Sequence, residues 1–314
     1  MTTSTQTDSG ATPATAAAAD AAGTSRPAVP GDGAATGYRY TGTLSFMTEF
    51  RRQLTRRRTQ LTLLGLVVLP IVIALAFRFG PQSDNRDSDN GGFGLVQVAT
   101  AGAANFTMFS LMVSTSFLLV VVVALFCGDT VASEASWGSL RYLLAVPVPR
   151  GRLLAVKLGV ALLYSAIAIV IMVTTCLAVG TVMFGWQPLQ ATIGGEVPAG
   201  EGLLRVFAAA GYVALMLMPV AGLAFFLSVS TDAPLGAVGG AVFLHIVSNI
   251  LDAITALGDI RNLLPTRYAY EWVGLLSSPA QTDGMVRGAL SALSYTVIFL
   301  GLAWWRFQRK DVTS

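Results

Sequence analysis

Six long apolar runs are the feature that most constrains what this chain can fold into. Each is close to the roughly 20 residues that a helix needs to cross the hydrocarbon core of a bilayer. We expect the six spans at residues 60–79, 101–126, 155–184, 204–229, 235–257 and 286–305. The chain is 54% hydrophobic and only 12% charged, whereas a soluble domain carries about 25% charged residues. The sequence therefore predicts an all-α polytopic membrane protein with six transmembrane helices, and its composition excludes a nucleic-acid-binding protein, a disordered protein and an ordinary soluble enzyme.

The residues before the first run divide into two parts. Residues 1–38 consist mainly of Ala, Thr, Ser, Gly and Pro, so they cannot bury a core and are expected to form a disordered cytoplasmic tail. Residues 39–59 are predicted to contain a basic amphipathic helix with arginines on one side. Its apolar side chains recur at intervals of three and four residues: Leu44, Met47, Phe50 and Leu54. Two interpretations remain open, an interfacial helix on an anionic inner leaflet and a basic collar ahead of the first span.

The distribution of basic residues predicts the orientation of the spans. If the N-terminus lies inside, twelve Lys and Arg residues face the cytoplasm and six lie in outer loops or at outer helix ends. This bias predicts a multi-pass membrane protein with both termini in the cytoplasm. The connection between the second and third runs then lies inside, and the connection between the fifth and sixth lies outside.

The connection between the second and third runs contains the most informative residues. Asp129 and Thr130 are expected to cap a helix, and the charge of Glu134 would complement its positive end. An apolar face follows at helical spacing, formed by Trp137, Leu140 and Leu144. A helix of about three turns is marginal by itself, so its apolar face needs a partner. Two alternatives are open: the helix lies flat on lipid, or it docks into a groove of a soluble protein.

This connection resembles that of type 2 ABC transporter permeases. The shared pattern is an acidic residue, then Gly-Ser/Thr-Leu, Leu-Leu and Pro-Val-x-Arg, and finally a Lys that opens the next span. Here it consists of Glu134, Gly138-Ser139-Leu140, Leu143-Leu144, Pro147-Val148-Pro149-Arg150 and Lys157. The chain departs from the pattern at Pro149, where the family usually has Ser, and at Val156, where it usually has Gly. A second similarity is Leu264-Pro265-Thr266 followed by Trp272, which resembles the outer re-entrant segment of these permeases.

The resemblance implies a function as the membrane subunit of an ATP-driven exporter, with residues 60–310 as the permease domain. In such permeases the loop helix is a coupling helix that sits on a separate ATP-binding subunit. The residues that this role implies are Asp129, Glu134, Trp137, Gly138, Leu140, Arg141, Leu144, Pro147 and Arg150. The resemblance also implies a second permease copy or paralogue in the complex, and a location in the bacterial cytoplasmic membrane. The alternative is a non-transporting membrane scaffold, which would anchor an assembly or signalling complex.

Chemistry within the chain itself is limited. It has no Gly-x-x-x-x-Gly-Lys-Ser/Thr motif for ATP phosphates, so we expect the chain not to be an enzyme and ATP and Mg to be bound by the partner subunit. Its two cysteines and single histidine match no metal-binding pattern, and no cofactor is expected. One polar stripe lies in the fifth run, where His245, Asn249 and Asp252 share a helix face. These residues either line a pathway or dimer interface, or they approach the outer surface, with His245 bonded to a neighbouring helix.

Overall fold

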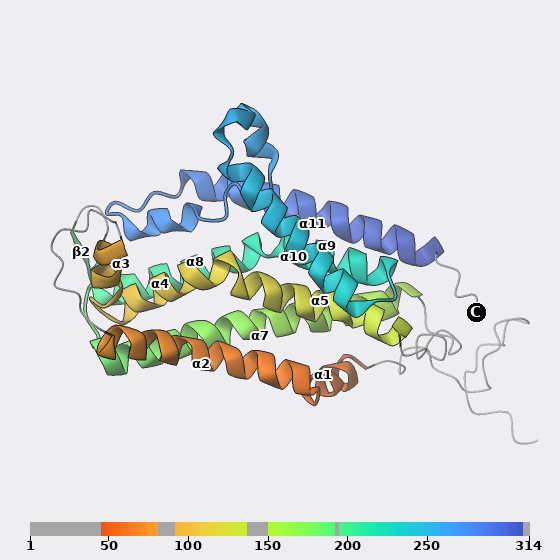
Figure 1. Ribbon diagram of the computed structural model, residues 1–314, viewed down its shortest axis with the longest axis horizontal. Helices are drawn as coiled ribbons and strands as arrows, with labels where there is room; N and C mark the ends of the chain where they lie inside the picture. The colour runs from red at the N-terminus through yellow and green to blue at the C-terminus, as the bar shows by residue number, and fades with distance from the viewer. Residues whose placement is uncertain (1–44, 81–91, 137–149, 192–194, 310–314) are drawn as a thin grey trace, which may run out of the picture. The chain divides into compact units, whose positions relative to one another are not determined.

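Helices dominate the part of the chain that the computed structural model describes, which is residues 45–80, 92–136, 150–191 and 195–309 (Figure 1). The expected tail at 1–38 and the apolar face of residues 137–149 lie outside these ranges. The described residues contain one short antiparallel strand pair, β1 (Leu189–Gln190) and β2 (Glu196–Val197). The expected all-α class is therefore confirmed.

Six helical segments are long and apolar enough to cross a membrane, as the sequence predicted. They are α2 (Arg57–Phe79), α5 (Leu118–Ser136), α7 (Arg150–Phe184), α8 with α9 (Ala199–Met216 and Met218–Ser230), α10 (Pro234–Ala253) and α11 (Asp283–Arg309). The shorter helices are α1 (Phe46–Leu54), α3 (Gly92–Ala99), α4 (Ala103–Ser116), η2 (Thr255–Leu263) and η3 (Glu271–Leu276). This is the architecture of a multi-pass membrane protein.

The second apolar run differs most from its expected form. It is interrupted at Phe117, which separates α4 from α5, and α5 then continues to Ser136. Two hydroxyl groups next to the break donate hydrogen bonds to backbone carbonyl oxygens of the preceding turn. Thr115 donates to the carbonyl of Leu111, and Ser116 donates to that of Val113. Such back-bonding bends helices.

The first part of this run, α4, is fastened to the β1 segment. The side-chain amide of Asn105 in α4 donates to the carbonyl oxygen of Gln190 at 2.9 Å, and its oxygen accepts from the Gln190 N–H at 3.0 Å. Asn105 is buried, so both hydrogen bonds are sheltered from water. They fix the start of α4 against the strand pair.

The fourth segment is interrupted between α8 and α9 near Pro219. Proline has no N–H, so the carbonyl four residues earlier has no helical partner there. Leu217 keeps a helical conformation, with φ −84° and ψ −10°. The interruption is therefore mild, and the two helices together span the length of one membrane segment.

Helix α5 occupies the centre of the bundle. In its apolar window 72% of the residues are buried, against 17% in those of α2, α10 and α11. It packs against α7, α9 and α10. Gly128 makes the contact with α10 close, since a Cβ at this position would lie 2.9 Å from the Cγ2 of Val238.

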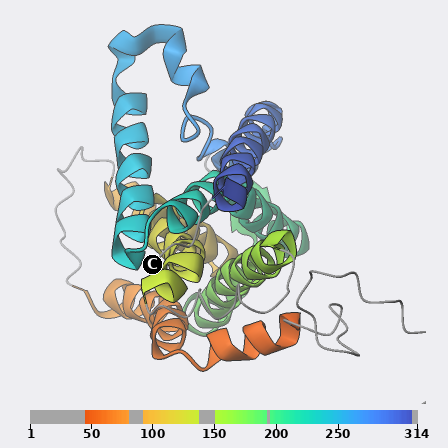
Figure 2. The ribbon, with the colours of Figure 1, turned by 90° about the vertical axis from the view of Figure 1, so that its right-hand side faces the viewer.

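Helix α10 runs at a steep angle to the neighbouring long helices, as Figures 1 and 2 show together. The connection from α10 to α11 contains η2 and η3, and η3 packs against α8 and α11. Trp272 of η3 is fully buried. The part of the chain expected as an outer re-entrant segment thus consists of short 3₁₀ helices, one of which inserts its aromatic side chain among the longer helices.

Candidate functional site

A buried group of charges joins α1, α5 and α7 at one end of the bundle. The ammonium group of Lys157 lies 2.6 Å from Oε1 of Glu134 and 3.3 Å from Oε1 of Glu49. Arg52 adds a guanidinium nitrogen 2.8 Å from the same oxygen of Glu134. The side chains of Lys157 and Glu134 are only 1% and 2% exposed. We call Glu49, Arg52, Glu134 and Lys157 the Lys157 cluster.

A second ion-pair group lies one to two turns earlier in α5. Arg56 Nη1 is 3.0 Å from Oδ2 of Asp129, and Arg58 Nη1 is 2.9 Å from Oδ1. The two guanidinium groups therefore hold both oxygens of one buried carboxylate. The expectation that Asp129 and Thr130 cap a new helix is wrong, because both residues lie inside α5. The helix can continue past Asp129 since the negative charge is neutralised by residues from the N-terminal segment.

Aromatic packing holds α1 on α7 and so places its charged residues. The rings of Phe50 and Tyr164 stack with centroids 4.9 Å apart. The Tyr164 hydroxyl donates to the carbonyl of Phe50 at 2.8 Å. Phe46, Met47 and Leu54 of α1 stay exposed. The helix thus packs on the protein through Glu49 and Phe50 and leaves these apolar side chains uncovered.

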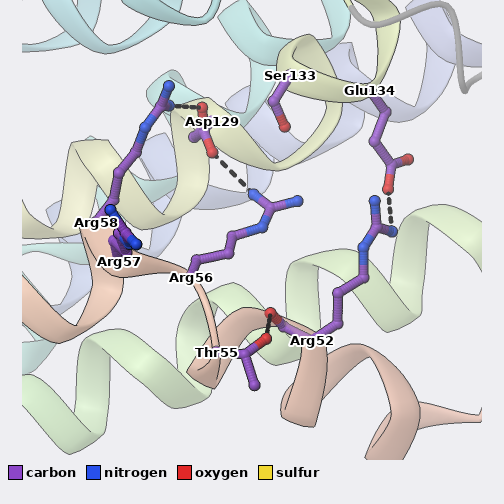
Figure 3. Close-up of a pocket in the computed structure, with 8 residues that line it drawn as sticks. All are labelled: Arg52, Thr55, Arg56, Arg57, Arg58, Asp129, Ser133 and Glu134. Carbon is purple, nitrogen blue, oxygen red and sulfur yellow. Dashed lines mark hydrogen bonds and ion pairs between the residues drawn. The ribbon is translucent and has the colours of Figure 1, made fainter.

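A pocket of about 690 Å³ opens between these two groups of charges (Figure 3). Its lining consists of Arg52, Thr55, Arg56, Arg57, Arg58, Asp129, Ser133 and Glu134. In Figure 3, Asp129 lies between Arg56 and Arg58, and Glu134 pairs directly with Arg52. Four guanidinium groups and two carboxylates line the pocket, so it carries two positive charges in excess. Below we call it the arginine pocket.

A known protein family matches most of the chain. Residues 68–313 match a family described as "Protein of unknown function (DUF2705)". The chain belongs to the DUF2705 family. The match begins within α2, so it includes Asp129, Glu134 and Lys157 but not the arginines that pair with them. No curated protein matches the chain.

The structure of this DUF2705 protein describes only some of the residues that the permease resemblance assigned to coupling. The structure brings Asp129 and Glu134 together near the end of α5 and places Arg150 at the start of α7. Six others lie outside the described residues: Trp137, Gly138, Leu140, Arg141, Leu144 and Pro147. Asp129 and Glu134 both pair with basic residues of the N-terminal segment. The described charges therefore fasten the last turns of α5 to the N-terminal segment.

Glu49 was not among the site residues predicted from the sequence, and Lys157 was included only as the last residue of the permease-like pattern. A signal was nevertheless present for Lys157, because it lies within a run predicted to be apolar. A charged side chain in such a run usually has a partner of opposite sign. Glu49 is an acidic residue within a basic amphipathic helix, and the helical pattern alone did not indicate which residue it would meet.

The polar stripe of α10 divides into separate environments in the structure. Asp252 lies 3.6 Å from Arg261 and 3.7 Å from Arg267, so its charge is balanced by the connection to α11. Asn249 donates to the backbone carbonyl of His245 in its own helix. The His245 ring has no hydrogen bond within the described residues. The three residues therefore do not bind one common partner there.

His245 borders an apolar pocket of about 340 Å³ between α9, α10 and α11. Its polar lining includes Ser248 and Thr266, whose buried hydroxyl oxygens are 2.8 Å apart. This hydrogen bond fastens the Leu264-Pro265-Thr266 turn to α10. The turn is consequently a part of the packed bundle.

Proposed function

We propose that this DUF2705 protein is the membrane-spanning permease subunit of an ATP-driven ABC transporter, namely an exporter coupled to a separate ATP-binding subunit. The observation that supports the proposal most directly is the buried pair of Lys157 with Glu134. It joins α5 to α7, the two helices that flank residues 137–149. A coupling segment attached in this way would pass a displacement to both helices together.

The length of α7 also supports this function. Its 35 residues correspond to roughly 50 Å at 1.5 Å per residue, whereas the hydrocarbon core is about 30 Å thick. Part of α7 therefore extends beyond the hydrocarbon. Its first turns carry Arg150, Arg152 and Lys157, and by the positive-inside rule these basic residues favour a cytoplasmic location for that part.

These positions suggest different roles for the charged and the apolar residues. Glu134 and Lys157 hold the helix ends, while Trp137, Leu140 and Leu144 would insert into a groove on the ATP-binding subunit. ATP and Mg would be bound by that subunit and not by this chain. The permease would then perform no enzymatic step itself and bind no cofactor or metal.

The remaining apolar faces suit a complex that contains a second permease. In the apolar windows of α2, α10 and α11 only 17% of the residues are buried. These faces would contact lipid and a second copy or a paralogue of the chain. The proposed location is the bacterial cytoplasmic membrane, with both termini in the cytoplasm, because basic residues gather at the end that contains α1 and the last turn of α11.

Charge substitutions in the coupling segment test the function. Leu140→Asp puts a charge on the apolar face, whereas Ser139→Asp puts the same charge on the opposite side of the predicted helix. Loss of an interface anchor of about 2 kcal/mol lowers affinity about thirtyfold. We expect Leu140→Asp to reduce co-purification of an ATPase encoded by a neighbouring gene and to uncouple ATP hydrolysis from transport, and Ser139→Asp to change neither.

Three outcomes would contradict the proposal. If equal amounts of ATPase are recovered with Leu140→Asp and with the unchanged chain, the segment is not the docking element. If no ATPase co-purifies with the unchanged chain, the scaffold function is favoured. If an ATPase co-purifies but its turnover never drives transport in vesicles, the chain is an anchor and not a permease.

A further inference from the structure

Arg57 differs from the other arginines of the arginine pocket. Arg52, Arg56 and Arg58 each form an ion pair with Asp129 or Glu134. Arg57 is exposed and has no acidic partner within the part of the chain that the structure describes. Its charge is therefore available to an anion in the pocket.

The paired arginines also keep donors for such an anion. A guanidinium group has five N–H donors in a planar fork. The ion pairs of Arg56 and Arg58 each use Nη1, so the other nitrogens can bind the oxygens of a phosphate, the anion whose geometry a guanidinium matches best. With two positive charges in excess, the pocket can neutralise one phosphodiester without losing its internal pairs.

The helix face below Arg57 is apolar and exposed. Leu61 and Leu64 follow Arg57 at i+4 and i+7, so all three residues share one face of α2. Leu61 is 67% exposed and Leu64 is 57% exposed. The cationic residue at the start of the helix matches the phosphate of a phospholipid, and the apolar stripe next to it matches an acyl chain.

The pocket has room for a complete headgroup. A neighbouring cavity of about 520 Å³ shares Arg58, Asp129 and Ser133 with the arginine pocket. It extends along the end of α5 toward Pro234 and Leu235 at the start of α10. The two cavities together form a recess that is cationic near α2 and apolar near α10.

We propose that the arginine pocket binds the phosphodiester headgroup of an anionic phospholipid, with an acyl chain along Leu61 and Leu64. Arg57 supplies the uncompensated charge, and Arg56 and Arg58 supply additional N–H donors. The apolar stripe favours a lipid over a free phosphate ion. This site is independent of the proposed transport function, because it requires neither an ATPase nor a second copy of the chain.

Lipid retention by the purified full-length chain tests the site. The chain is reconstituted with equal amounts of phosphatidylglycerol and phosphatidylcholine and washed in detergent, and the bound lipids are counted by native mass spectrometry. Arg57→Gln removes the unpaired charge, and Arg306→Gln removes the same charge from the exposed last turn of α11. One basic residue near an anionic surface contributes about fivefold in affinity. We expect Arg57→Gln to lower phosphatidylglycerol retention about fivefold, and Arg306→Gln to leave it unchanged.

Each other outcome would overturn the assignment. Equal losses in the two variants would mean that only the net charge attracts lipid. Equal retention of phosphatidylcholine would exclude an anionic site. Displacement of phosphatidylglycerol by millimolar inorganic phosphate or glycerol phosphate would show that the pocket recognises the free anion and not the lipid.

Discussion

Lys157 and Glu134 form an ion pair of 2.6 Å in which both side chains are withdrawn from solvent. Each partner comes from a different helix, and each has a further contact with the N-terminal segment: Lys157 with Glu49, and Glu134 with Arg52. The pair therefore connects three helices at one point. Disruption of this pair should therefore weaken the packing of all three helices.

The first prediction concerns the stability of this connection. Lys157→Met should lower the free energy of unfolding by about 3 kcal/mol, because Glu49 and Glu134 then lose the buried ammonium group that both of them contact. Unfolding in a mild detergent, followed by intrinsic fluorescence, measures the loss. The double variant Lys157→Met with Glu134→Gln should recover part of the stability, since the uncompensated charge is removed. A double variant as unstable as the sum of the single changes would contradict a direct coupling between the two side chains.

A second prediction addresses the docking of α1. Tyr164→Phe removes the hydroxyl that donates to the Phe50 carbonyl and keeps the stacked ring. We expect a loss of about 1 kcal/mol, seen as faster hydrogen exchange of the amides in α1. Exchange in α11 serves as the internal reference and should not change. Unaltered exchange in α1 would indicate that this contact does not hold the helix in place.

The close approach of α5 and α10 yields a third prediction. Gly128→Ala places a Cβ 2.9 Å from Val238 Cγ2 and 3.2 Å from its backbone nitrogen, so overpacking should cost about 1–3 kcal/mol. Gly211→Ala is the matched control, because a Cβ there meets nothing within 4 Å. That change should be neutral or slightly stabilising in a helix. Melting temperatures of the two purified variants give the comparison, and equal values would contradict the close contact.

The orientation can be checked with single cysteines at the two ends of the bundle. Gly200 is exposed at the start of α8, and Thr55 is exposed beside the arginine pocket. In intact cells an impermeant maleimide should label Gly200→Cys and not Thr55→Cys, whereas both should react after lysis. Background should be low because Cys127 and Cys176 are buried. Labelling of Thr55→Cys from outside would reverse the proposed topology.

The six membrane-spanning segments could be predicted because apolar run length is a local property of the sequence. The end of the second segment could not, because α5 continues ten residues beyond the expected end at residue 126 and contains an Asp129 that is neutralised by distant arginines. Asp129 was expected to start a helix, yet Arg56 and Arg58 hold it inside one. Nothing near Asp129 in the sequence indicates that residues more than seventy positions earlier neutralise it.

The candidate site could be predicted only in part, because it too depends on contacts between residues far apart in the sequence. The stretch between α5 and α7 was recognised by its own motif, but the Lys157 cluster depends on how α1 packs. Glu49 reaches Lys157 across 108 positions of sequence. Helical periodicity identified α1 as basic and amphipathic and did not indicate that its acidic residue would be buried.

The interruption at Phe117 divides the central segment into two helices. The first half, α4, is held by Asn105 on the β1 strand, while the second half, α5, is held by Lys157 and the arginines of the N-terminal segment. The two halves are thus fastened to different parts of the molecule. A force on the end of α5 that carries Glu134 would therefore reach α1 and α7 through buried ion pairs, whereas α4 has its own attachment to the strand pair.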